Sequence, residues 1–333
     1  MRIVIDAFGG DNAPIEIIKG ASMASNEYKV EITLTGDEKV IDKCILDNSL
    51  TFYGNLEIVH TTDVISMHDD PTSILKAHKD CSMALAFKEL AEGRADAFVS
   101  AGSTGAIVVG GTLIVKRIKG VKRPALAGLI PSPKSNYLLM DMGANAECRP
   151  EMLAQFGVMA SVYMEEVENR KNPTVGLLNI GTEETKGDEL RLEAYKLLNE
   201  APINFIGNVE SREMPKGVAD IVITDGFTGN IALKLIEGTS ITLFKLLKGA
   251  MLKNFTNKIA ALILKKDFFE LKKLMDSSET GGAPLLGVSK PVIKAHGSSD
   301  AKAIKNAVRQ AVSFTKRQVI ETITENLSKV GKE

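Results

Sequence analysis

The chain has 333 residues, of which 44% are hydrophobic and 25% charged, as in an ordinary globular protein. Its net charge of −1 gives no global field that attracts nucleic acid, so we expect no nucleic-acid partner. Cys44, Cys81 and Cys148 are scattered without metal-ligand spacing, which is typical of reduced cytoplasmic thiols. The first residues enter a strand pattern rather than a signal peptide, and no apolar run approaches the ~18 residues of a membrane-spanning helix.

Strand and helix patterns alternate along the chain. The predicted strands are Arg2–Ala7, Glu31–Thr35, Leu56–His60, Ala95–Val99, Tyr137–Asp141, Thr174–Ile180, Ile203–Ile206 and Ala219–Thr224. The predicted helices include Val40–Leu46, Ser73–Glu92, one from about Pro150, Glu189–Leu198, Ile231–Met275 and Ala301–Glu325. This alternation predicts an α/β fold with a mostly parallel sheet. We treat residues 1–333 as one catalytic domain, within which residues 231–280 form a helical extension.

A polar loop with one lysine follows the most continuously apolar strand pattern. Thr174–Ile180 is apolar apart from Asn179, which is typical of a strand buried on both faces. Gly181 ends it, and the loop that follows contains Lys186. In open parallel sheets, ligands bind at the carboxyl ends of the strands, although a solvated loop would also explain this stretch.

Four other predicted strands end in the same way, with Gly plus Asp, Asn, Ser or Thr followed by a helix. The four loops are Asp6–Asn12, Ser100–Ala106, Asp141–Asn145 and Asp225–Asn230. Glycine and Asx residues are good turn and cap residues, which explains any one loop. Because parallel strands end at one edge, we expect all five loops to converge there as an amide-rich site for an anion, with Lys186 as its cation.

The strand-end motifs, taken together and in order, resemble the bacterial phosphate acyltransferase (PlsX) family. The motifs are Asp6-Ala-Phe-Gly-Gly-Asp11, Ser100-Ala-Gly-Ser-Thr-Gly-Ala106, Asp141-Met-Gly-Ala-Asn145, Gly176-Leu-Leu-Asn-Ile-Gly181 with Lys186-Gly187, Asp225-Gly-Phe-Thr-Gly-Asn230, Gly281-Gly-Ala-Pro-Leu-Leu-Gly287 and His296-Gly-Ser-Ser299. They cover nearly the whole chain. Phe8 stands where the family usually has Met, and Ser103 where it usually has Asn, which leaves the contact of Ser103 open.

The resemblance implies a reaction and a fold. Acyl-[acyl carrier protein] and inorganic phosphate would give acyl phosphate and free carrier protein, and the acyl phosphate would supply a membrane acyltransferase that starts phospholipid synthesis. The implied fold is a three-layer α/β/α sandwich like that of isopropylmalate dehydrogenase. The implied assembly is a cytoplasmic homodimer without nucleotide, metal or other cofactor.

This chemistry suits the residues at the predicted strand ends. Phosphate is largely a dianion near neutral pH and a thiolate leaves easily, so the enzyme mainly has to place two anions and stabilise an oxyanion. We expect Lys186 to neutralise phosphate and transition-state charge, and Asn230 to hydrogen-bond phosphate or the thioester oxygen. The remaining expected substrate-binding residues are Gly9, Gly10, Asp11, Ser100, Gly102, Ser103, Thr104, Gly105, Asn145, Asn179, Gly229 and His296. We interpret most of the strand-end aspartates as structural caps.

Two basic segments are candidates for larger partners. Lys116, Arg117, Lys119, Lys122 and Arg123 would dock an acidic carrier protein, unless they form only a solvated helix end. Residues 245–273 contain eight lysines and two acidic residues, a net charge of +6.

The apolar run within residues 245–273 is Ile259, Ala260, Ala261, Leu262, Ile263 and Leu264. It is too short to span a bilayer, but flanking lysines with an apolar tip are typical of an interfacial anchor on an anionic membrane surface. Packing in a helical dimer interface is the alternative. We expect both, with the helix stems in the dimer and Ile259, Leu262, Ile263 and Leu264 at the membrane.

Three other functions remain open. A short-chain phosphotransacylase that uses acyl-coenzyme A would share the same site. A metal- and NAD-dependent hydroxy-acid dehydrogenase on this fold would need an arginine cluster and paired metal aspartates, which the sequence does not present. A non-enzymatic membrane scaffold that binds carrier protein leaves the glycine-rich loops without a role.

Overall fold

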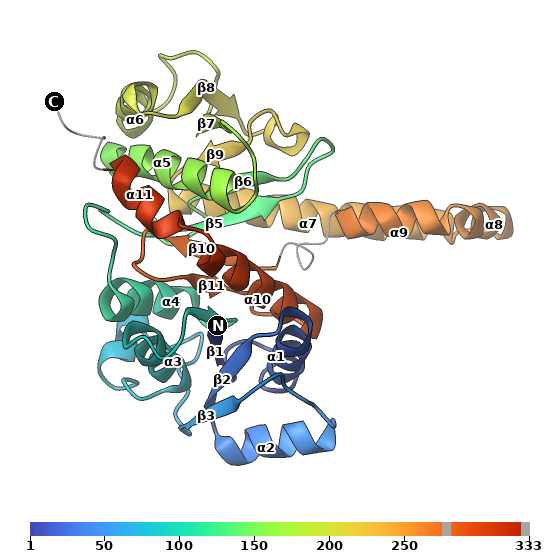
Figure 1. The fold of residues 1–333 in the computed structure, drawn as a ribbon. Coiled ribbons are helices and arrows are strands. Elements are labelled where there is room, and N and C mark those ends of the chain that lie inside the picture. Colours follow the sequence, from blue (N-terminus) through green and yellow to red (C-terminus); the bar gives the residue numbers. More distant parts are fainter. Residues whose placement is uncertain (275–280, 328–333) are drawn as a thin grey trace.

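The computed structural model describes residues 1–274 and 281–327 (Figure 1). Its strands are β1 (Arg2–Asp6), β2 (Glu31–Gly36), β3 (Leu56–His60), β4 (Ala97–Ser100), β5 (Ala125–Ile130), β6 (Tyr137–Met140), β7 (Thr174–Asn179), β8 (Asn204–Glu210), β9 (Ile221–Ile223), β10 (Ala283–Leu286) and β11 (Val292–Lys294). Its α-helices are α1 (Ile15–Tyr28), α2 (Glu38–Asp47), α3 (Ser82–Ala91), α4 (Thr104–Gly110), α5 (Pro150–Glu166), α6 (Glu189–Glu200), α7 (Gly226–Met251), α8 (Phe255–Ile263), α9 (Lys265–Leu274), α10 (Ala301–Lys316) and α11 (Val319–Leu327). Short 3-10 or π turns are η1 (Pro71–Leu75), η2 (Gly111–Val115) and η3 (Met214–Lys216).

The strands form one sheet with helices on both faces. Its order is β3-β2-β1-β4-β11-β10-β5-β6-β9-β7-β8. In the amino-terminal half, α1 and α10 bury one face, and α3 and α4 bury the other. In the carboxyl-terminal half, α5 and α11 pack on one face, and the first turns of α7 pack on the other. The predicted three-layer α/β/α architecture with a mostly parallel sheet is therefore confirmed.

The two halves of the sheet run in opposite directions. β1, β2, β3, β4 and β11 are mutually parallel, and so are β6, β7, β8 and β9. The strands between them, β10 and β5, pair antiparallel with their neighbours and reverse the direction. The prediction that all five glycine-rich loops lie at one edge is therefore wrong. The loops after β1 and β4 lie at one edge, and those after β6, β7 and β9 lie at the other.

Several predicted boundaries also need correction. The helix predicted from Ser73 begins only at Ser82, because η1 and a run of turns precede it and the Cys81 thiol caps α3. The glycine-rich motif Gly281–Gly287 contains β10, which was not among the predicted strands. β5 and β11 were not predicted, and each begins directly after a proline. The final helix divides into α10 and α11.

The predicted helical extension projects from the body as an arm. It is formed by the distal part of α7 together with α8 and α9 (Figure 1). Residues 275–280 of the predicted extension lie outside the described residues. The arm is not one continuous helix, because α7 ends at Met251 and Asn254 caps a new helix, with its side chain accepting from the Asn257 amide at 2.8 Å. No helix in the described part of the chain is both long and apolar enough to cross a membrane.

Candidate active site

The loop after β1 and the loop after β4 are joined by a buried carboxylate. Asp6 accepts hydrogen bonds from the Ser82 hydroxyl at 2.7 Å and from the Ser100 hydroxyl at 2.8 Å. Burial raises the pKa of the Asp6 carboxyl, and these hydrogen bonds oppose that shift. The Ser100 oxygen also accepts from the Gly102 amide at 3.0 Å. Ser100 therefore shapes this wall of the site from within the protein.

The glycines of the β1 loop allow it to lie directly against the β4 loop. A Cβ atom at Gly9 would lie 2.7 Å from the Ser100 hydroxyl and 2.8 Å from the Gly102 amide nitrogen. Gly10 has φ of +102°, and a Cβ there would lie 2.9 Å from the Gly297 carbonyl oxygen. That same carbonyl accepts from the Asp11 amide at 2.8 Å. Three predicted site segments therefore meet here, from β1, β4 and the turn after β11.

The rest of this edge presents small polar groups. Ser103 is buried at the start of α4, and Thr104 and Gly105 are half-buried in its first turn. His296 is exposed, and its Nδ1 accepts from the Ser298 amide at 3.2 Å. The same Nδ1 lies 2.8 Å from the Ser298 hydroxyl, so the Ser298 turn fixes the ring of His296 at this edge.

At the other edge, Asp141 organises the loop after β6. Its carboxylate accepts from the amides of Leu126, Gly143, Ala144 and Asn145, and from the Asn145 side chain at 2.9 Å. Burial raises the Asp141 pKa against these hydrogen bonds. The Asn145 side chain also donates to the Pro124 carbonyl at 2.8 Å. Asp141 is a structural residue, as predicted for most strand-end aspartates, and the Asn145 amide group is engaged within the protein.

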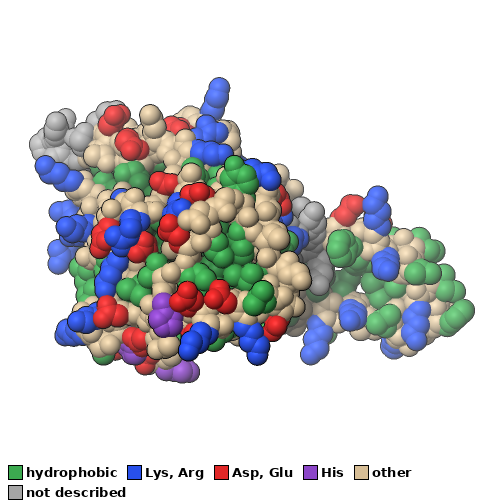
Figure 2. All heavy atoms as spheres, turned by 60° about the horizontal axis from the view of Figure 1, so that its bottom comes forward, with side chains coloured by type: hydrophobic (Ala, Val, Ile, Leu, Met, Phe, Trp, Pro, Cys, Tyr) green, Lys and Arg blue, Asp and Glu red, His purple; other side chains and the backbone are tan. Residues whose placement is uncertain are grey.

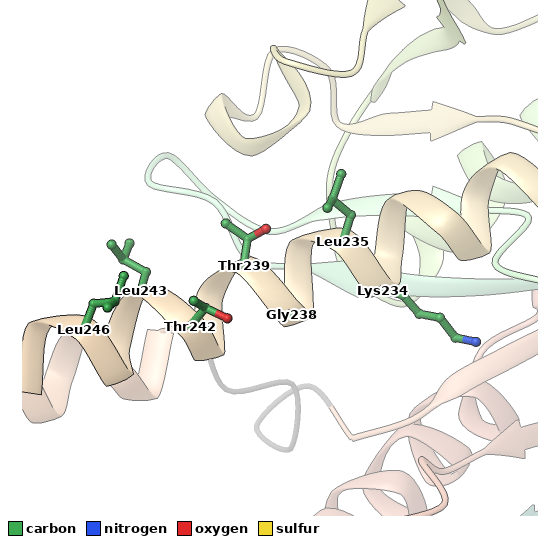
Figure 3. Close-up of a pocket in the computed structure, with 7 residues that line it drawn as sticks. All are labelled: Lys234, Leu235, Gly238, Thr239, Thr242, Leu243 and Leu246. Atoms are coloured by element: carbon green, nitrogen blue, oxygen red, sulfur yellow. The ribbon is translucent and has the colours of Figure 1, made fainter.

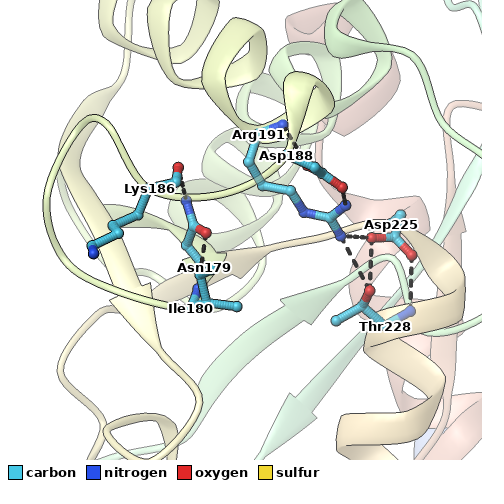
Figure 4. Close-up of polar contacts among 7 residues, drawn as sticks. All are labelled: Asn179, Ile180, Lys186, Asp188, Arg191, Asp225 and Thr228. Carbon is cyan, nitrogen blue, oxygen red and sulfur yellow. Dashed lines mark hydrogen bonds and ion pairs between the residues drawn. The ribbon is translucent and has the colours of Figure 1, made fainter.

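Asn179 holds the Lys186 loop, and Lys186 itself points outward. The Asn179 side chain donates to the Lys186 carbonyl at 3.0 Å and accepts from the Ile180 amide at 2.8 Å. The Lys186 side chain is exposed, and within residues 1–274 and 281–327 no hydrogen bond or ion pair occupies its ammonium. Figure 4 shows the ammonium directed away from the Asn179 side chain, which bonds the Lys186 carbonyl. The arrangement presents a compact cation on a fixed loop.

An arginine that the sequence analysis missed joins this loop to α7. Arg191, in the first turn of α6, forms an ion pair with Asp188 at 2.9 Å and a second, closer one with Asp225, the residue that caps α7 (Figure 4). Its guanidinium also donates to the Thr228 hydroxyl at 3.1 Å. The sequence contained a signal for this residue. Arg191 stands three residues after the cap residue Asp188, a spacing at which a helical side chain can reach back and contact the capping residue.

Asn230 lies in the first turns of α7, held close to the β6 loop. Gly229 permits this contact, because a Cβ atom there would lie 1.9 Å from the Asp141 carbonyl oxygen. A Cβ at Gly143 would be 3.4 Å from the Asn230 side chain, so Asn230 is next to that loop. Asn230 is half-buried. Lys186 and Asn230 therefore lie on two segments that Arg191 ties together, although the described residues show no direct contact between them.

A second residue that the sequence analysis missed is Lys294, at the carboxyl end of β11. It is half-buried, and burial lowers the pKa of its ammonium to about 8, while the Glu237 carboxylate on α7 acts in the opposite direction. Glu237 lies seven residues after Asn230, on the same side of α7. Among the described residues, no group of three or more His, Cys, Asp or Glu side chains is arranged to hold a metal ion.

The predicted docking cluster lies on the segment between η2 and β5. Lys116, Arg117, Lys119, Lys122 and Arg123 are all exposed. Arg117 donates to the carbonyl groups of Val121 and Lys122, so its guanidinium shapes the segment. The segment ends at Pro124, whose carbonyl binds Asn145. The end of the cluster therefore lies next to the β6 loop.

Two solved structures of phosphotransacylases have a similar fold. A phosphotransacetylase from Streptococcus pyogenes aligns over 95% of this chain and 94% of its own, with a TM-score of 0.66 and 15% identity. A branched-chain phosphotransacylase from Enterococcus faecalis aligns over 95% of this chain with a TM-score of 0.58 and 15% identity. At these identities the likeness shows the fold.

Sequence comparison is more specific. The family model described as fatty acid synthesis protein matches residues 1–322. A phosphate acyltransferase of Alkaliphilus oremlandii is 49% identical over 99% of this chain and 98% of its own length. A phosphate acyltransferase of Oceanobacillus iheyensis is 47% identical over the whole chain and 99% of its own length. The chain therefore belongs to the phosphate acyltransferase family, and it is an enzyme that transfers an acyl group to phosphate.

Proposed function

We propose that the acyl donor is a fatty acyl-[acyl carrier protein], and that the acyl phosphate product supplies a membrane acyltransferase at the start of phospholipid synthesis. The observation that carries the mechanism is the Arg191 bridge, which fixes the Lys186 loop and the first turn of α7 to each other. We place the reaction where these segments and the β6 loop border the first turns of α7.

The proposed chemistry needs no protein nucleophile. A phosphate oxygen attacks the thioester carbon, the carbon–sulfur bond breaks, and the carrier leaves as a thiolate. Lys186 presents an ammonium that is unpaired within residues 1–274 and 281–327 and that offsets phosphate and transition-state charge. Asn230 offers a neutral amide beside the β6 loop that hydrogen-bonds phosphate or the thioester oxygen. Gly229 keeps α7 close to the β6 loop, and Gly9 and Gly10 keep the β1 loop close to the β4 loop, where His296 adds a polar ring.

The basic segment favours a protein donor over a small one. Carrier proteins are acidic, and a cluster of exposed Lys and Arg side chains provides complementary charge. Because this segment leads into Pro124, a carrier docked on it would sit beside the loop of Asp141 and Asn145. The pantetheine arm would then have only a short distance to travel to Asn230.

We propose that the arm forms the homodimer. Along α7, Lys234, Leu235, Gly238, Thr239, Thr242, Leu243 and Leu246 line an open hollow (Figure 3). Gly238 has no atom of its own chain within 4 Å of a built Cβ, and Leu246 is 67% exposed. Small residues beside exposed leucines on one helical face form a surface into which another helix can pack. The occupant we propose is the same helix of a second copy.

The far end of the arm is the proposed membrane contact. Ile259, Leu262, Ile263 and Leu264 are all exposed, and Phe255 on the same helix is 79% exposed. Figure 2 shows hydrophobic side chains gathered over the arm among Lys and Arg side chains. Apolar insertion and attraction to anionic lipid would then act together. This contact would hold the cytoplasmic enzyme at the inner face of the cell membrane.

A donor comparison tests the proposal. The enzyme is assayed for acyl phosphate, trapped with hydroxylamine, using palmitoyl-[acyl carrier protein], palmitoyl-coenzyme A and acetyl-coenzyme A in turn. We expect the highest kcat/KM with the carrier-protein donor. Preference for acetyl-coenzyme A would support a short-chain phosphotransacylase, which the phosphotransacetylase fold neighbour favours. Carrier binding without turnover from any donor would instead support a scaffold.

A further inference from the structure

Lys294 occupies a defined position among the strand ends. It pairs with Ser100 of β4 in the parallel register. Val292, two residues earlier, packs in the same hydrophobic cluster as Phe98, whereas Ile293 packs in the cluster on the opposite face. Because side chains alternate along a strand, Lys294 shares the face of Ser100. Neighbouring strands are about 4.8 Å apart, so the lysine stands beside the wall formed by the β1 and β4 loops.

The same side chain approaches α7. Glu237 is close enough for its carboxylate to affect the Lys294 ammonium. Asn230 lies seven residues earlier on α7, about 10 Å along the helix axis and on the same side. Lys294 therefore stands at the strand ends of the amino-terminal half, within electrostatic range of Glu237 on the helix that carries Asn230.

The Lys294 ammonium is poorly satisfied by the protein. It donates to the carbonyl of the next residue, Ala295, at 3.0 Å. No carboxylate among the described residues forms an ion pair with it. A bond to an adjacent carbonyl holds no two segments together, so the lysine contributes little to the architecture. A desolvated cation in a site is costly unless an anion joins it.

We propose that the Lys294 ammonium binds the phosphate anion that accepts the acyl group, as a cation additional to Lys186. The proposal rests on the proposed acyl transfer and adds a residue from β11 to its phosphate site. A bound phosphate dianion would supply the negative charge that no described carboxylate provides to Lys294. The same contact would then bind phosphate and stabilise the charge that develops on it in the transition state. Lys294 is then a catalytic residue beside the wall formed by the β1 and β4 loops.

The charged groups around Lys294 determine its pH response. On α7, Glu237 favours the ammonium, and Lys234 extends from the same helix toward the side of β10, β11 and α10 (Figure 3). Asp6 lies on β1, two strands away from Lys294, with Ser100 of β4 between them. His296 lies two residues after Lys294 in the chain. β10 contributes no titratable side chain. Without phosphate, the ammonium loses its proton as the pH rises through about 8, so kcat/KM for phosphate should fall there.

Direct chemistry on the lysine gives a test independent of turnover. The unliganded enzyme is labelled with a limiting amine-reactive reagent at pH 8, and modification of each lysine is quantified by mass spectrometry. We expect Lys294 to react faster than Lys290, which is also half-buried and donates to the Leu90 carbonyl at 2.7 Å. Inorganic phosphate should protect Lys294 by tenfold or more. Protection by coenzyme A but not by inorganic phosphate would assign Lys294 to the donor's phosphate and overturn the proposal.

Kinetics complete the test, using Lys294→Met, Lys294→Arg and the control Lys290→Met. Lys294→Met should raise the KM for phosphate or lower kcat, by tenfold or more in kcat/KM, with an unchanged KM for the acyl donor. Its melting temperature without phosphate should stay level or rise, because a desolvated cation is removed. Lys294→Arg should retain part of the activity and lose the decline above pH 8.

A Lys294→Met enzyme with normal phosphate kinetics and no phosphate protection in the wild type would refute the role of Lys294. Failure of the wild type to make acyl phosphate from any donor would refute the proposed function instead, while the labelling result would still stand.

Discussion

The guanidinium of Arg191 pairs with the carboxylate of Asp225 across 34 residues of sequence, and so joins the start of α6 to the start of α7. The Arg191 side chain is 15% exposed and that of Asp225 is 6% exposed, so the pair is largely shielded from water. Asp225 also caps α7 through the Thr228 amide at 2.8 Å. The pair therefore sets the position of Asn230 relative to the loop that carries Lys186.

Arg191→Met should disturb both stability and turnover. Removing one partner leaves a buried carboxylate without its cation, which costs about 3 kcal/mol in the free energy of unfolding. Small displacements of positioned groups lower turnover on the order of 10- to 100-fold. Urea unfolding and kcat measure the two effects separately. The double variant Arg191→Met/Asp225→Asn should recover stability but not turnover; full recovery of turnover would show that Arg191 positions nothing.

Lys186→Ala should lower kcat by ~10²-fold or more with an unchanged melting temperature, because the side chain is exposed and its ammonium makes no hydrogen bond or ion pair within the described residues. Lys186→Arg should restore little, since a planar fork replaces a compact charge. Turnover and thermal melting of the same preparations check both statements. The exposed residue Lys196, on α6, provides the control as Lys196→Ala. Near-normal turnover of Lys186→Ala would remove this lysine from the mechanism.

Gly229→Ala should displace the start of α7, because the new methyl group meets the Asp141 carbonyl oxygen at 1.9 Å. Since that contact is with backbone, the helix has to move, and we expect a lower melting temperature and a kcat reduced more than tenfold. Gly249→Ala is the matched control on the same helix, where a Cβ meets nothing within 4 Å. It should be neutral or stabilise the helix by up to about 1 kcal/mol. Equal behaviour of the two variants would contradict the packing described for α7.

Reversing the charge of Lys119 and Lys122 should raise the KM for acyl-[acyl carrier protein] severalfold, and more at low salt, because both are exposed and complement an acidic partner. The KM for phosphate should not change. Arg117 is left intact since it binds backbone carbonyls of its own segment. The control reverses Lys39 and Lys43 on α2, which are equally exposed. If both pairs of reversals alter carrier kinetics alike, the docking surface is not this segment.

Leu262→Glu with Ile263→Glu should abolish co-sedimentation with anionic liposomes while oligomeric state and turnover remain. The two side chains are 72% and 74% exposed, so the folded chain loses little packing. Leu46→Glu on α2 is the control, because Leu46 is 76% exposed outside the arm. Dissociation of the oligomer would place the run in the subunit interface. Sedimentation at the wild-type level would exclude this tip as the anchor.

Local patterns predicted the strands and helices well wherever a strand was apolar and its loop contained glycine. Leu56–His60 was predicted at its observed limits, and α5 begins at Pro150 as expected. The direction of strands could not be predicted, because it depends on β10 and β5, whose pairing is set by distant partners. For this reason we predicted from the sequence that all five loops lie at one edge of the sheet, whereas in the structure they lie at two opposite edges.

The same limit applies to the site. The sequence motifs predicted site residues among the glycine, aspartate and asparagine residues at strand ends. In the structure, Asp6, Asp141 and Asn179 form hydrogen bonds that hold those loops in place. Lys294 was not considered, because a lysine at the end of a short strand carries no periodic signal. Only its position opposite α7 reveals it.

Helix α7 is 26 residues long, which corresponds to about 39 Å of continuous rod. Its first turn is clamped by Asp225 and by the contact of Gly229 with the backbone of Asp141, and its far end leads into the exposed apolar helix α8. A rod held at one end acts as a lever. Force applied anywhere along α7 is therefore delivered to the turn that contains Asn230, whereas the break between Met251 and Asn254 separates this rod from the apolar tip on α8.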